Sequence, residues 1–265
     1  MFIKEYKCDN HILPEVYDHY NMGDIAYFDI ETTGFDKDKE KIILISLGHY
    51  DDIDNFSVKQ YFADELCEES AVLKAFKEDL MQFDTWCSYN GIAFDEPFIE
   101  NRFKVNGLVF HKPSKHIDLY RKIKPYSKQL GLERCNLKSV EKYIGIERHD
   151  RIDGGMSVEL YSEYIQNKDD ELKETILLHN YEDVLNLPQI FNLVHDIECN
   201  QNLVRNDFIT EKQLKFLKSL LKRQKIDVDF NIEKISKSAA SKMIDTLLKG
   251  KSSYEDLAHI LESSY

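Results

Sequence analysis

The segment AYFDIETTGF, residues 26–35, places two acidic residues, Asp29 and Glu31, where an apolar run meets a turn. Residues two apart on a β-strand project to the same side, so we expect both carboxylates on one face at the end of a strand. Parallel carboxylates repel each other unless a cation lies between them, and oxygen ligands suit Mg²⁺ or Mn²⁺ better than zinc. The alternative interpretation makes Asp29 a turn former and Glu31 a surface acid. The D-x-E pair alone does not decide between a metal site and this alternative.

Two later segments could complete such a site. In YNGIAFDEPF, Asp95 opens an expected helix just after an expected strand, although an ordinary N-cap would look the same. In HNYEDV, His179 and Asp183 are four residues apart and therefore share one helix face. A solvent-facing pair with that spacing is the plain alternative, and it adds only about 0.2–0.5 kcal/mol to a helix. Each motif is weak evidence when it is taken alone.

The apolar pattern predicts the elements that hold these residues. Residues 25–30 are apolar on both alternating faces, which is typical of a central buried strand. The polar links that follow are short, and short links favour antiparallel hairpins. We expect strands over 25–30, 41–50, 57–62, 85–89 and 116–119, and helices over 69–83, 95–104, 136–144, 157–166 and 169–197, the last broken around Pro188. This order of elements predicts an α/β domain with a mixed sheet.

The order and spacing of the three motifs resemble a known superfamily. DIETTG at 29–34, N-x3-F-D at 90–95 and H-x3-D at 179–183 resemble the three motifs of the DEDD (DnaQ-like) 3′–5′ exonucleases, whose fold is RNase H-like. The segments HIDLY, NLKSVEKYIGIER and IDG resemble the YprB-like branch of that superfamily, with coverage from about residue 24 to 197. The resemblance implies an RNase H-like sheet with three antiparallel strands and further parallel strands, flanked by helices.

The resemblance also implies roles for individual residues. The four family carboxylates, which bind two Mg²⁺ or Mn²⁺ ions, match Asp29, Glu31, Asp95 and Asp183. The general base matches His179, and histidine exchanges a proton near neutral pH. Contacts to the terminal nucleotide match Thr32, Thr33 and Asn90, and Phe94 is placed to stack on a base. These last four residues equally suit ordinary turns and core packing.

One position departs from the family pattern. The superfamily has either a histidine five residues before the last aspartate or a tyrosine four residues before it. This chain has His179 at the tyrosine spacing, and Leu178, which cannot act as a base, at the histidine spacing. Either His179 works from the tyrosine position or the attacking water loses its proton without it. We favour His179 as the base.

The function that follows is a metal-dependent 3′–5′ exonuclease. It would hydrolyse phosphodiester bonds from the 3′ end by a two-metal mechanism, on nucleic acid with a single-stranded 3′ end, with DNA favoured over RNA. Two alternatives stay open: a catalytically inactive nucleic-acid-binding module of the same fold, and a structure-specific endonuclease.

Composition limits the class of protein. The chain has 265 residues, 42% of them hydrophobic, and a formal net charge of −13. Residues 101–151 nevertheless hold 13 Lys and Arg against 5 Asp and Glu, which suits either a phosphate-facing surface or a solvated helix face. No apolar run is long enough to span a membrane, and the charges within the first 15 residues do not suit a secretory signal. Five scattered cysteines without a C-x-x-C pair indicate reduced thiols in the cytoplasm and no zinc site.

We expect the exonuclease domain over 1–198, a polar linker over 199–209 and a small helical accessory module over 210–265. Thr210 and Gln213 form a capping-box pattern at the start of one amphipathic helix. A second helix is expected over 236–249, with Gly250 as its stop. This two-helix module would bind nucleic acid or a protein partner, or pack against the first domain.

Overall fold

The computed structural model describes residues 1–250 and 252–262. Contacts within the chain group the residues into two compact units. The first, which we call the sheet unit, comprises Met1–Tyr120 and Arg134–Cys199; the second, the helical unit, comprises Arg121–Glu133 and Asn200–Tyr265. Residues 121–133, which the sequence analysis assigned to the first domain, are thus grouped with the C-terminal residues.

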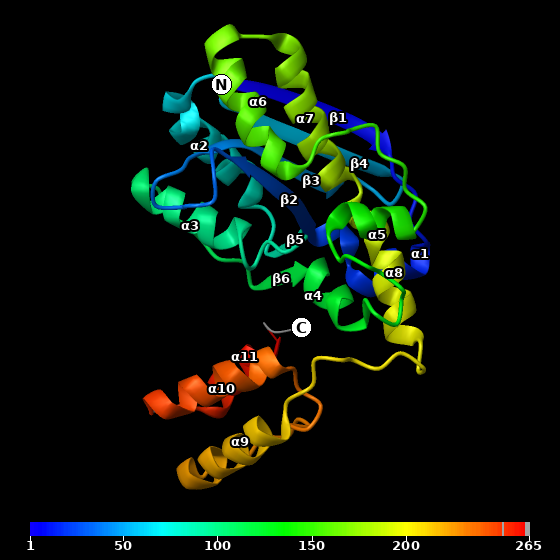
Figure 1. Cartoon of the computed structure of the whole chain (residues 1–265), viewed down its shortest axis with the longest axis vertical. Helices are drawn as coiled ribbons and strands as arrows, with labels where there is room; N and C mark the ends of the chain where they lie inside the picture. The colour runs from blue at the N-terminus through cyan, green and yellow to red at the C-terminus, as the bar shows by residue number, and fades with distance from the viewer. Residues whose placement is uncertain (251, 263–265) are drawn as a thin grey trace. The chain divides into compact units, whose positions relative to one another are not determined.

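A six-stranded sheet forms the centre of the sheet unit (Figure 1). Its order is β1-β4-β3-β2-β5-β6, with antiparallel pairing from β1 to β2 and parallel pairing from β2 through β5 to β6. The strands are β1 (Phe2–Asp9), β2 (Ile25–Thr32), β3 (Ile42–Tyr50), β4 (Asn55–Phe62), β5 (Thr85–Ser88) and β6 (Lys115–Asp118). The mixed α/β sheet predicted from the sequence is confirmed, with one antiparallel strand more than expected.

The additional strand, β1, was missed because it is an edge strand whose sequence lacks a continuous apolar run. Its side chains alternate between half-buried and exposed, and charged residues interrupt the apolar ones. Charged residues are common on edge strands, where they discourage pairing with other chains. The first helix, α1 (Pro14–Tyr20), was also not predicted.

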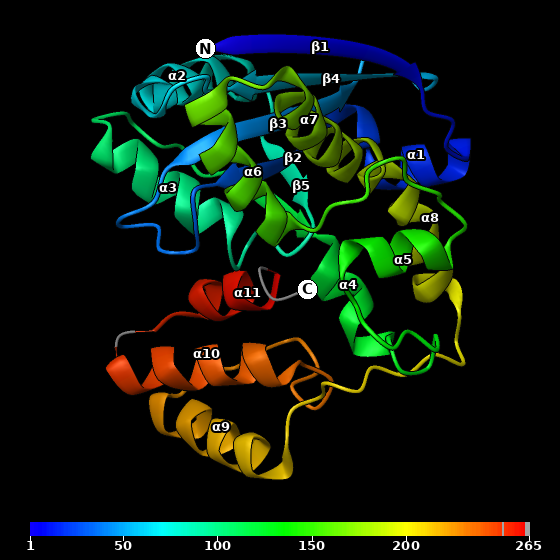
Figure 2. The same cartoon turned by 45° about the horizontal axis from the view of Figure 1, so that its top comes forward.

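Helices cover both faces of the sheet (Figure 2). Helix α2 packs on one face of β3 and β4, and α6 and α7 pack on the other face. The predicted break near Pro188 is confirmed, because α7 ends and α8 begins around Asn186. The remaining bounds are α2 (Glu69–Leu80), α3 (Asp95–Val105), α4 (Leu119–Ile123), α5 (Leu137–Tyr143), α6 (Gly154–Asn167), α7 (Asp170–Leu185) and α8 (Leu187–Cys199), with short 3-10 turns at Met22–Asp24, Leu66–Glu68 and Lys124–Tyr126.

Strand β2 lies between β3 and β5 and is buried along most of its length. Ala26, Phe28 and Ile30 belong to the apolar core on the α2 side. The intervening residues Asp29 and Glu31 therefore face the side that carries α7. The alternation of the strand is what places both carboxylates on one face.

In the C-terminal part of the helical unit, α9 (Glu211–Gln224), α10 (Lys237–Lys249) and α11 (Tyr254–Glu262) share one apolar core. The capping box at Thr210 and Gln213 is present, and Gly250 follows α10 with a φ of 77°. The two-helix prediction was wrong because it missed α11. Its signal was a reciprocal cap, in which Ser253 and Asp256 each accept a hydrogen bond from the other's backbone N–H. Within the described residues, every helix is too short or too polar to traverse a lipid bilayer.

Candidate active site

A cavity of about 410 Å³ lies beside the end of β2. It brings together most of the residues singled out from the sequence, from strand β2, from the loop before α3 and from α7. The lining residues are Asp29, Ile30, Glu31, Thr32, Gly34, Phe35, Tyr89, Phe94, Arg134, Asn136, Leu137, Lys138, Asp153, Val158, His179 and Asp183.

Asp95 lies directly behind this lining, at the first position of α3. Its Oδ1 accepts a hydrogen bond of 3.2 Å from the backbone N–H of Ile30, which ties α3 to β2. The approach depends on Gly91, where a Cβ would lie 2.2 Å from Ser88 Oγ and 3.2 Å from Asp95 Oδ2. Any larger residue at this position would displace the loop that delivers Asp95.

Asp29 is held from α7. The side-chain amide of Asn180 donates to Asp29 Oδ2 at 2.7 Å. Asn180 is itself fixed, because its Oδ1 accepts a hydrogen bond from the buried hydroxyl of Ser46. Asn180 was not among the predicted site residues, and its position directly after His179 was the only signal for it in the sequence.

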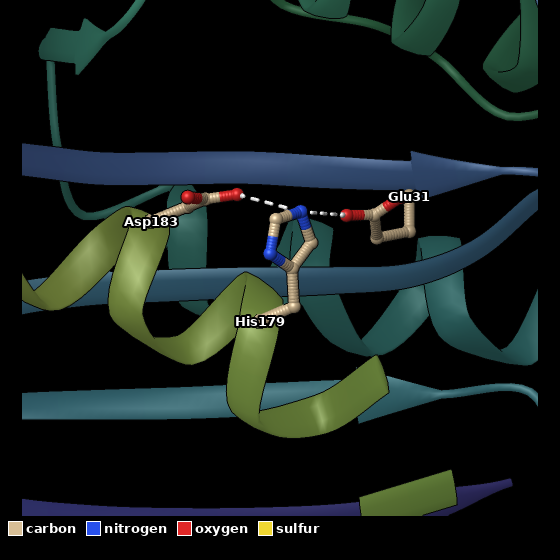
Figure 3. A group of neighbouring side chains, drawn as sticks. All are labelled: Glu31, His179 and Asp183. Carbon is tan, nitrogen blue, oxygen red and sulfur yellow. Dashed lines mark ion pairs between the residues drawn. The ribbon is translucent and has the colours of Figure 1, made fainter. Parts of the chain in front are cut away.

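His179 projects between two carboxylates (Figure 3). Its Nε2 lies 3.6 Å from Glu31 Oε1 and 3.5 Å from Asp183 Oδ2. The candidate ligand atoms of these three buried residues all lie within 4.8 Å of one another. The four-residue spacing on α7 thus directs both His179 and Asp183 toward the acids of β2, as the sequence analysis expected.

An arginine that the sequence analysis did not single out joins this cluster. Arg148, in the loop between α5 and α6, donates from Nη1 to Asp183 Oδ1 at 2.5 Å and from Nη2 to the backbone carbonyl of His179 at 2.9 Å. It also contacts Glu141 of α5 at 3.1 Å. The guanidinium therefore connects α5 to the α7 turn that carries the histidine and the aspartate.

Asp150 is a second acid that the sequence analysis did not single out. It accepts a hydrogen bond from Arg148 and one of 2.9 Å from Lys138, and its Oδ1 lies 3.2 Å from Nδ1 of His179. Burial opposes the charge of Asp150, but the bond from Lys138 and the charge of Arg148 lower its pKa. Two groups meet at Nδ1 of His179: the Asp150 carboxylate could accept a proton from this nitrogen, whereas Nη2 of Arg148, 3.5 Å away, can only donate to it.

Three acids of the site, Asp29, Glu31 and Asp95, resist ionisation. Burial raises the pKa of Asp29 well above its usual range, and the charges of Asp95 and Asp183 raise it further. Burial and the charge of Asp183 raise the pKa of Glu31 in the same direction. Burial raises the pKa of Asp95 to about 7, although hydrogen bonds from backbone N–H groups oppose this rise. A bound cation would offset these unfavourable terms.

The donor set therefore suits a divalent cation. Carboxylate oxygens dominate it, which is the preference of Mg²⁺ and Mn²⁺. One imidazole nitrogen lies among them. The ligand atoms of Glu31, His179 and Asp183 converge, and the raised pKa values of Asp29 and Glu31 indicate that the protein balances the charge of these acids only in part.

The four residues assigned to substrate contact separate into two groups. Thr32 and Phe94 line the cavity, whereas Thr33 and Asn90 are not among its lining residues. Thr33 donates to Glu40 Oε2 at 2.6 Å, and Asn90 adopts a left-handed φ of 67° with its N–H bonded to Asp118. Both have the turn roles that the sequence analysis left open.

Phe94 has an aromatic neighbour at the cavity. The rings of Phe94 and Phe35 lie edge to face with centroids 6.1 Å apart, and Phe35 is 82% exposed. Phe35 was not among the predicted site residues, although it ends the segment that carries Asp29 and Glu31. An exposed aromatic ring beside the acids is a surface on which a base could stack.

The basic stretch over 101–151 has several structural roles. Arg102 pairs with Glu69 in the interior of the sheet unit, and Lys112 pairs with Glu96 and Glu100. Arg134 and Lys138 line the cavity. Only part of this stretch therefore faces the candidate site.

Comparison with known proteins agrees with the fold. Residues 26–195 match the model of the RNase H superfamily. The uncharacterized protein YprB of Bacillus subtilis (strain 168) is 30% identical over 181 residues, which are 65% of this chain and 42% of YprB. The chain thus spans less than half the length of this relative. The match confirms the predicted similarity to an RNase H-like protein of the YprB type.

A solved structure shares the same fold. The family B DNA polymerase from the hyperthermophilic archaeon Pyrobaculum calidifontis superposes with a TM-score of 0.50 at 17% identity, over 89% of this chain and 28% of the polymerase. This likeness concerns the fold alone. The assignment to the DEDD subtype and the roles of the individual residues stay predictions.

Proposed function

Since the chain belongs to the RNase H superfamily, we propose that it is a metal-dependent nuclease that removes nucleotides from the 3′ end of a nucleic acid. Membership of this superfamily suggests a nuclease. The observation that carries the proposal is the convergence of Asp29, Glu31 and Asp183 around one cavity, with Asp95 behind them. Clustered buried carboxylates are typical of sites that hold a cation, and the pKa values of Asp29, Glu31 and Asp95 are raised.

The carboxylates of Asp29, Glu31, Asp95 and Asp183 would hold two Mg²⁺ or Mn²⁺ ions. Such ions, when bound, activate the attacking water and stabilise the leaving 3′ oxygen. Asn180 orients Asp29 through its amide, and Arg148 orients Asp183. The scaffold therefore restricts the rotation of two ligands before any ion binds, which lowers the cost of organising the site.

His179 is the proposed base. In the tautomer with the proton on Nδ1, where Asp150 Oδ1 lies 3.2 Å away, Nε2 can accept a proton from water at the carboxylate cluster. The same Nε2 is also a candidate metal ligand. The two roles differ in one measurement, because a base contributes to kcat while a ligand contributes to ion affinity.

We therefore propose comparing His179→Ala with the parent protein in two assays. If His179 is the base, kcat falls by about 10²–10⁴-fold while the affinity for Mn²⁺, measured by calorimetry, stays the same. A large loss of Mn²⁺ affinity would instead make His179 a ligand, and an unchanged kcat would remove it from the mechanism.

Digestion of a 5′-labelled strand tests the proposed reaction. We expect Mn²⁺-dependent shortening into a ladder of products from the 3′ end, faster on single-stranded DNA than on duplex DNA or RNA. A single internal cut would indicate a structure-specific endonuclease, and retained binding without any product would indicate an inactive binding module.

Two variants on the same helix make the assay specific. Asp183→Asn should abolish digestion, whereas Asp170→Asn, which alters an exposed acid at the start of α7, should leave the rate unchanged. Equal activity of the two variants would contradict the site.

A further inference from the structure

The exposed face of α9 combines cations with an aromatic ring. Residues spaced three and four apart share a helix face, and one such set on α9 is exposed: Lys212, Lys215, Phe216, Ser219, Lys222 and Arg223. We call this set the α9 face. The opposite side of the helix carries Leu217, Leu220 and Leu221, which are buried in the core of the helical unit. The α9 face is therefore not needed for packing within that unit.

The cations of the α9 face are available for a partner. Within residues 1–250 and 252–262, no acidic side chain forms an ion pair with Lys212, Lys215, Lys222 or Arg223. Lys218, on the flank of the same helix, does bond to Glu233 at 2.8 Å. The ion pair between Lys218 and Glu233 therefore lies on the flank of α9 and does not involve the cations of the α9 face.

Phe216 lies among these cations and is 45% exposed. The exposed part of this ring adds nothing to the core of the unit, and the outer face of an amphipathic helix is usually polar. Positive charge along a groove or helix, interleaved with aromatic rings, is the combination that binds single-stranded nucleic acid: cations track the phosphates and rings stack on bases.

The charges of the two units differ in sign. The helical unit has 16 Lys and Arg against 10 Asp and Glu, a net of +6, whereas the sheet unit has 19 against 38, a net of −19. A polyanion is therefore attracted to the helical unit and repelled by most of the sheet unit. A nuclease whose catalytic unit is this acidic gains from a separate basic surface that retains its substrate.

We propose that the α9 face binds a single-stranded nucleic acid, with Lys212, Lys215, Lys222 and Arg223 along the phosphates and Phe216 stacked on a base. The inference rests on the proposed function for its choice of nucleic acid over other polyanions. It adds to that function a binding surface outside the cavity.

Binding of a fluorescent single-stranded oligothymidylate to the full chain, measured by anisotropy in EDTA, tests the proposal. Replacing Phe216 by Ala should weaken binding about tenfold, as for the loss of one stacked base. The Lys215→Gln, Lys222→Gln double variant should reduce the slope of log K against log salt concentration by about 1.4, since each phosphate contact on a single strand contributes about 0.7.

A matched control separates this face from general charge. The triple variant Lys237→Gln, Leu248→Ala, Lys249→Gln removes two exposed cations and one exposed apolar side chain from α10. It should bind like the parent protein. An equal loss of affinity in the α9 and α10 variants would overturn the proposal. So would α9 variants whose affinity and salt slope equal those of the parent protein. A parent protein that binds duplex DNA more tightly than single strands would also overturn it.

Metal-free binding and Mn²⁺-dependent digestion are separate readouts, so the two proposals can fail independently. Binding that depends on the α9 face without any digestion would refute the proposed nuclease and leave this surface standing. Digestion with α9 variants that bind like the parent would refute this surface alone.

Discussion

The buried acids of the sheet unit differ in how the protein compensates their charge. We compare two sets: Glu69, which lies outside the cavity, and the acids of the candidate site, Asp29, Glu31 and Asp95. Glu69, at the start of α2 and 4% exposed, accepts two hydrogen bonds of 2.7 Å from Arg102 and a third of 2.9 Å from the backbone N–H of Ile42. Asn106 donates a further bond at 3.1 Å. Burial opposes the charge of Glu69, but these partners together lower its pKa. Glu69 is a structural acid whose charge the protein balances by itself.

The acids of the cavity have weaker compensation. Asp29 receives an amide hydrogen bond from Asn180, and the charge of Arg148 offsets only part of the repulsion around it. The pKa values of Asp29, Glu31 and Asp95 are therefore raised, while that of Glu69 is lowered. The contrast teaches that burial of an acid does not itself indicate a cation site; converging acids whose charge the protein compensates only in part are better candidates.

The largest expected effect separates the two sets by activity. Asp29→Asn should reduce nuclease activity by about a thousandfold or more, because several kcal/mol of transition-state stabilisation depend on metal ligands. The Asp29→Asn variant should unfold in urea at the parental concentration or above it, since it removes a carboxyl whose ionised form is unfavourable at this position. Glu78→Gln, an exposed acid on α2, serves as the control with parental activity. Full activity in the Asp29 variant would remove this residue from the site.

The next effect separates the two sets by stability. Glu69→Gln leaves Arg102 buried without its counter-charge, and breaking a buried ion pair costs about 3–5 kcal/mol of unfolding free energy. Urea unfolding measures this loss. The Glu69→Met, Arg102→Met double variant should recover much of the stability, because it leaves no unpaired charge. If Glu69→Gln were no less stable than Asp29→Asn, the distinction between the two sets would fail.

Asp150 sharpens the comparison because it has features of both sets. It is partnered like Glu69, but one of its neighbours is the histidine of the cavity. Asp150→Asn should lower kcat about 10–100-fold with little change in KM. General base catalysis contributes about 10²–10⁴-fold to the rate, and the positioning of His179 by Asp150 would account for only part of that contribution. The acidic limb of the pH–rate profile should move as well. A purely structural role would lower the amount of folded protein and leave that limb unchanged.

The smallest expected effect is a difference in pH dependence. The pKa of Asp95 is raised to about 7, so the folded metal-free protein binds more protons than the unfolded chain between about pH 4 and pH 7. Its unfolding free energy should therefore fall as the pH rises through this window. Asp95→Asn should flatten the fall.

Glu69 should show the opposite sign. The pKa of Glu69 is lowered in the folded protein. Its contribution to the unfolding free energy is therefore present when the pH is above the ordinary pKa of glutamate, and it is lost as the pH falls through the pKa of the folded state. Urea unfolding of Asp95→Asn and Glu69→Gln in EDTA, from pH 3 to pH 8, measures both. The contribution of Asp95 is the difference in unfolding free energy between the parent protein and Asp95→Asn. If this contribution rose between pH 5 and pH 7, it would contradict the raised pKa of Asp95.

Much of this was predictable from local sequence. Alternation along β2 placed Asp29 and Glu31 on one face, and helical spacing placed His179 and Asp183 on another. Strands β2 to β6 and helices α2, α3 and α5 to α8 were found because each carries its own apolar period, whereas β1 and α1 were missed. These are short-range regularities, and they require no knowledge of how the chain folds back.

The partners of the site were not predictable in this way. Arg148 and Asp150 come from an irregular loop, and Asn180 reaches Asp29 across 151 residues of sequence. Their roles depend on tertiary contacts that no local period encodes. The same applies to Glu69 and Arg102, whose pairing joins α2 to α3 and distinguishes a structural acid from those of the cavity.

Calorimetric titration with Mn²⁺ at pH 8 tests the central claim most directly: the incompletely compensated acids hold the cation, and the fully partnered one does not. We expect saturable binding by the parent protein, at least tenfold weaker binding by Asp29→Asn, and parental binding by Glu69→Gln at a temperature where it is folded. Parental Mn²⁺ affinity in Asp29→Asn, or no saturable binding by the folded parent protein, would contradict the account.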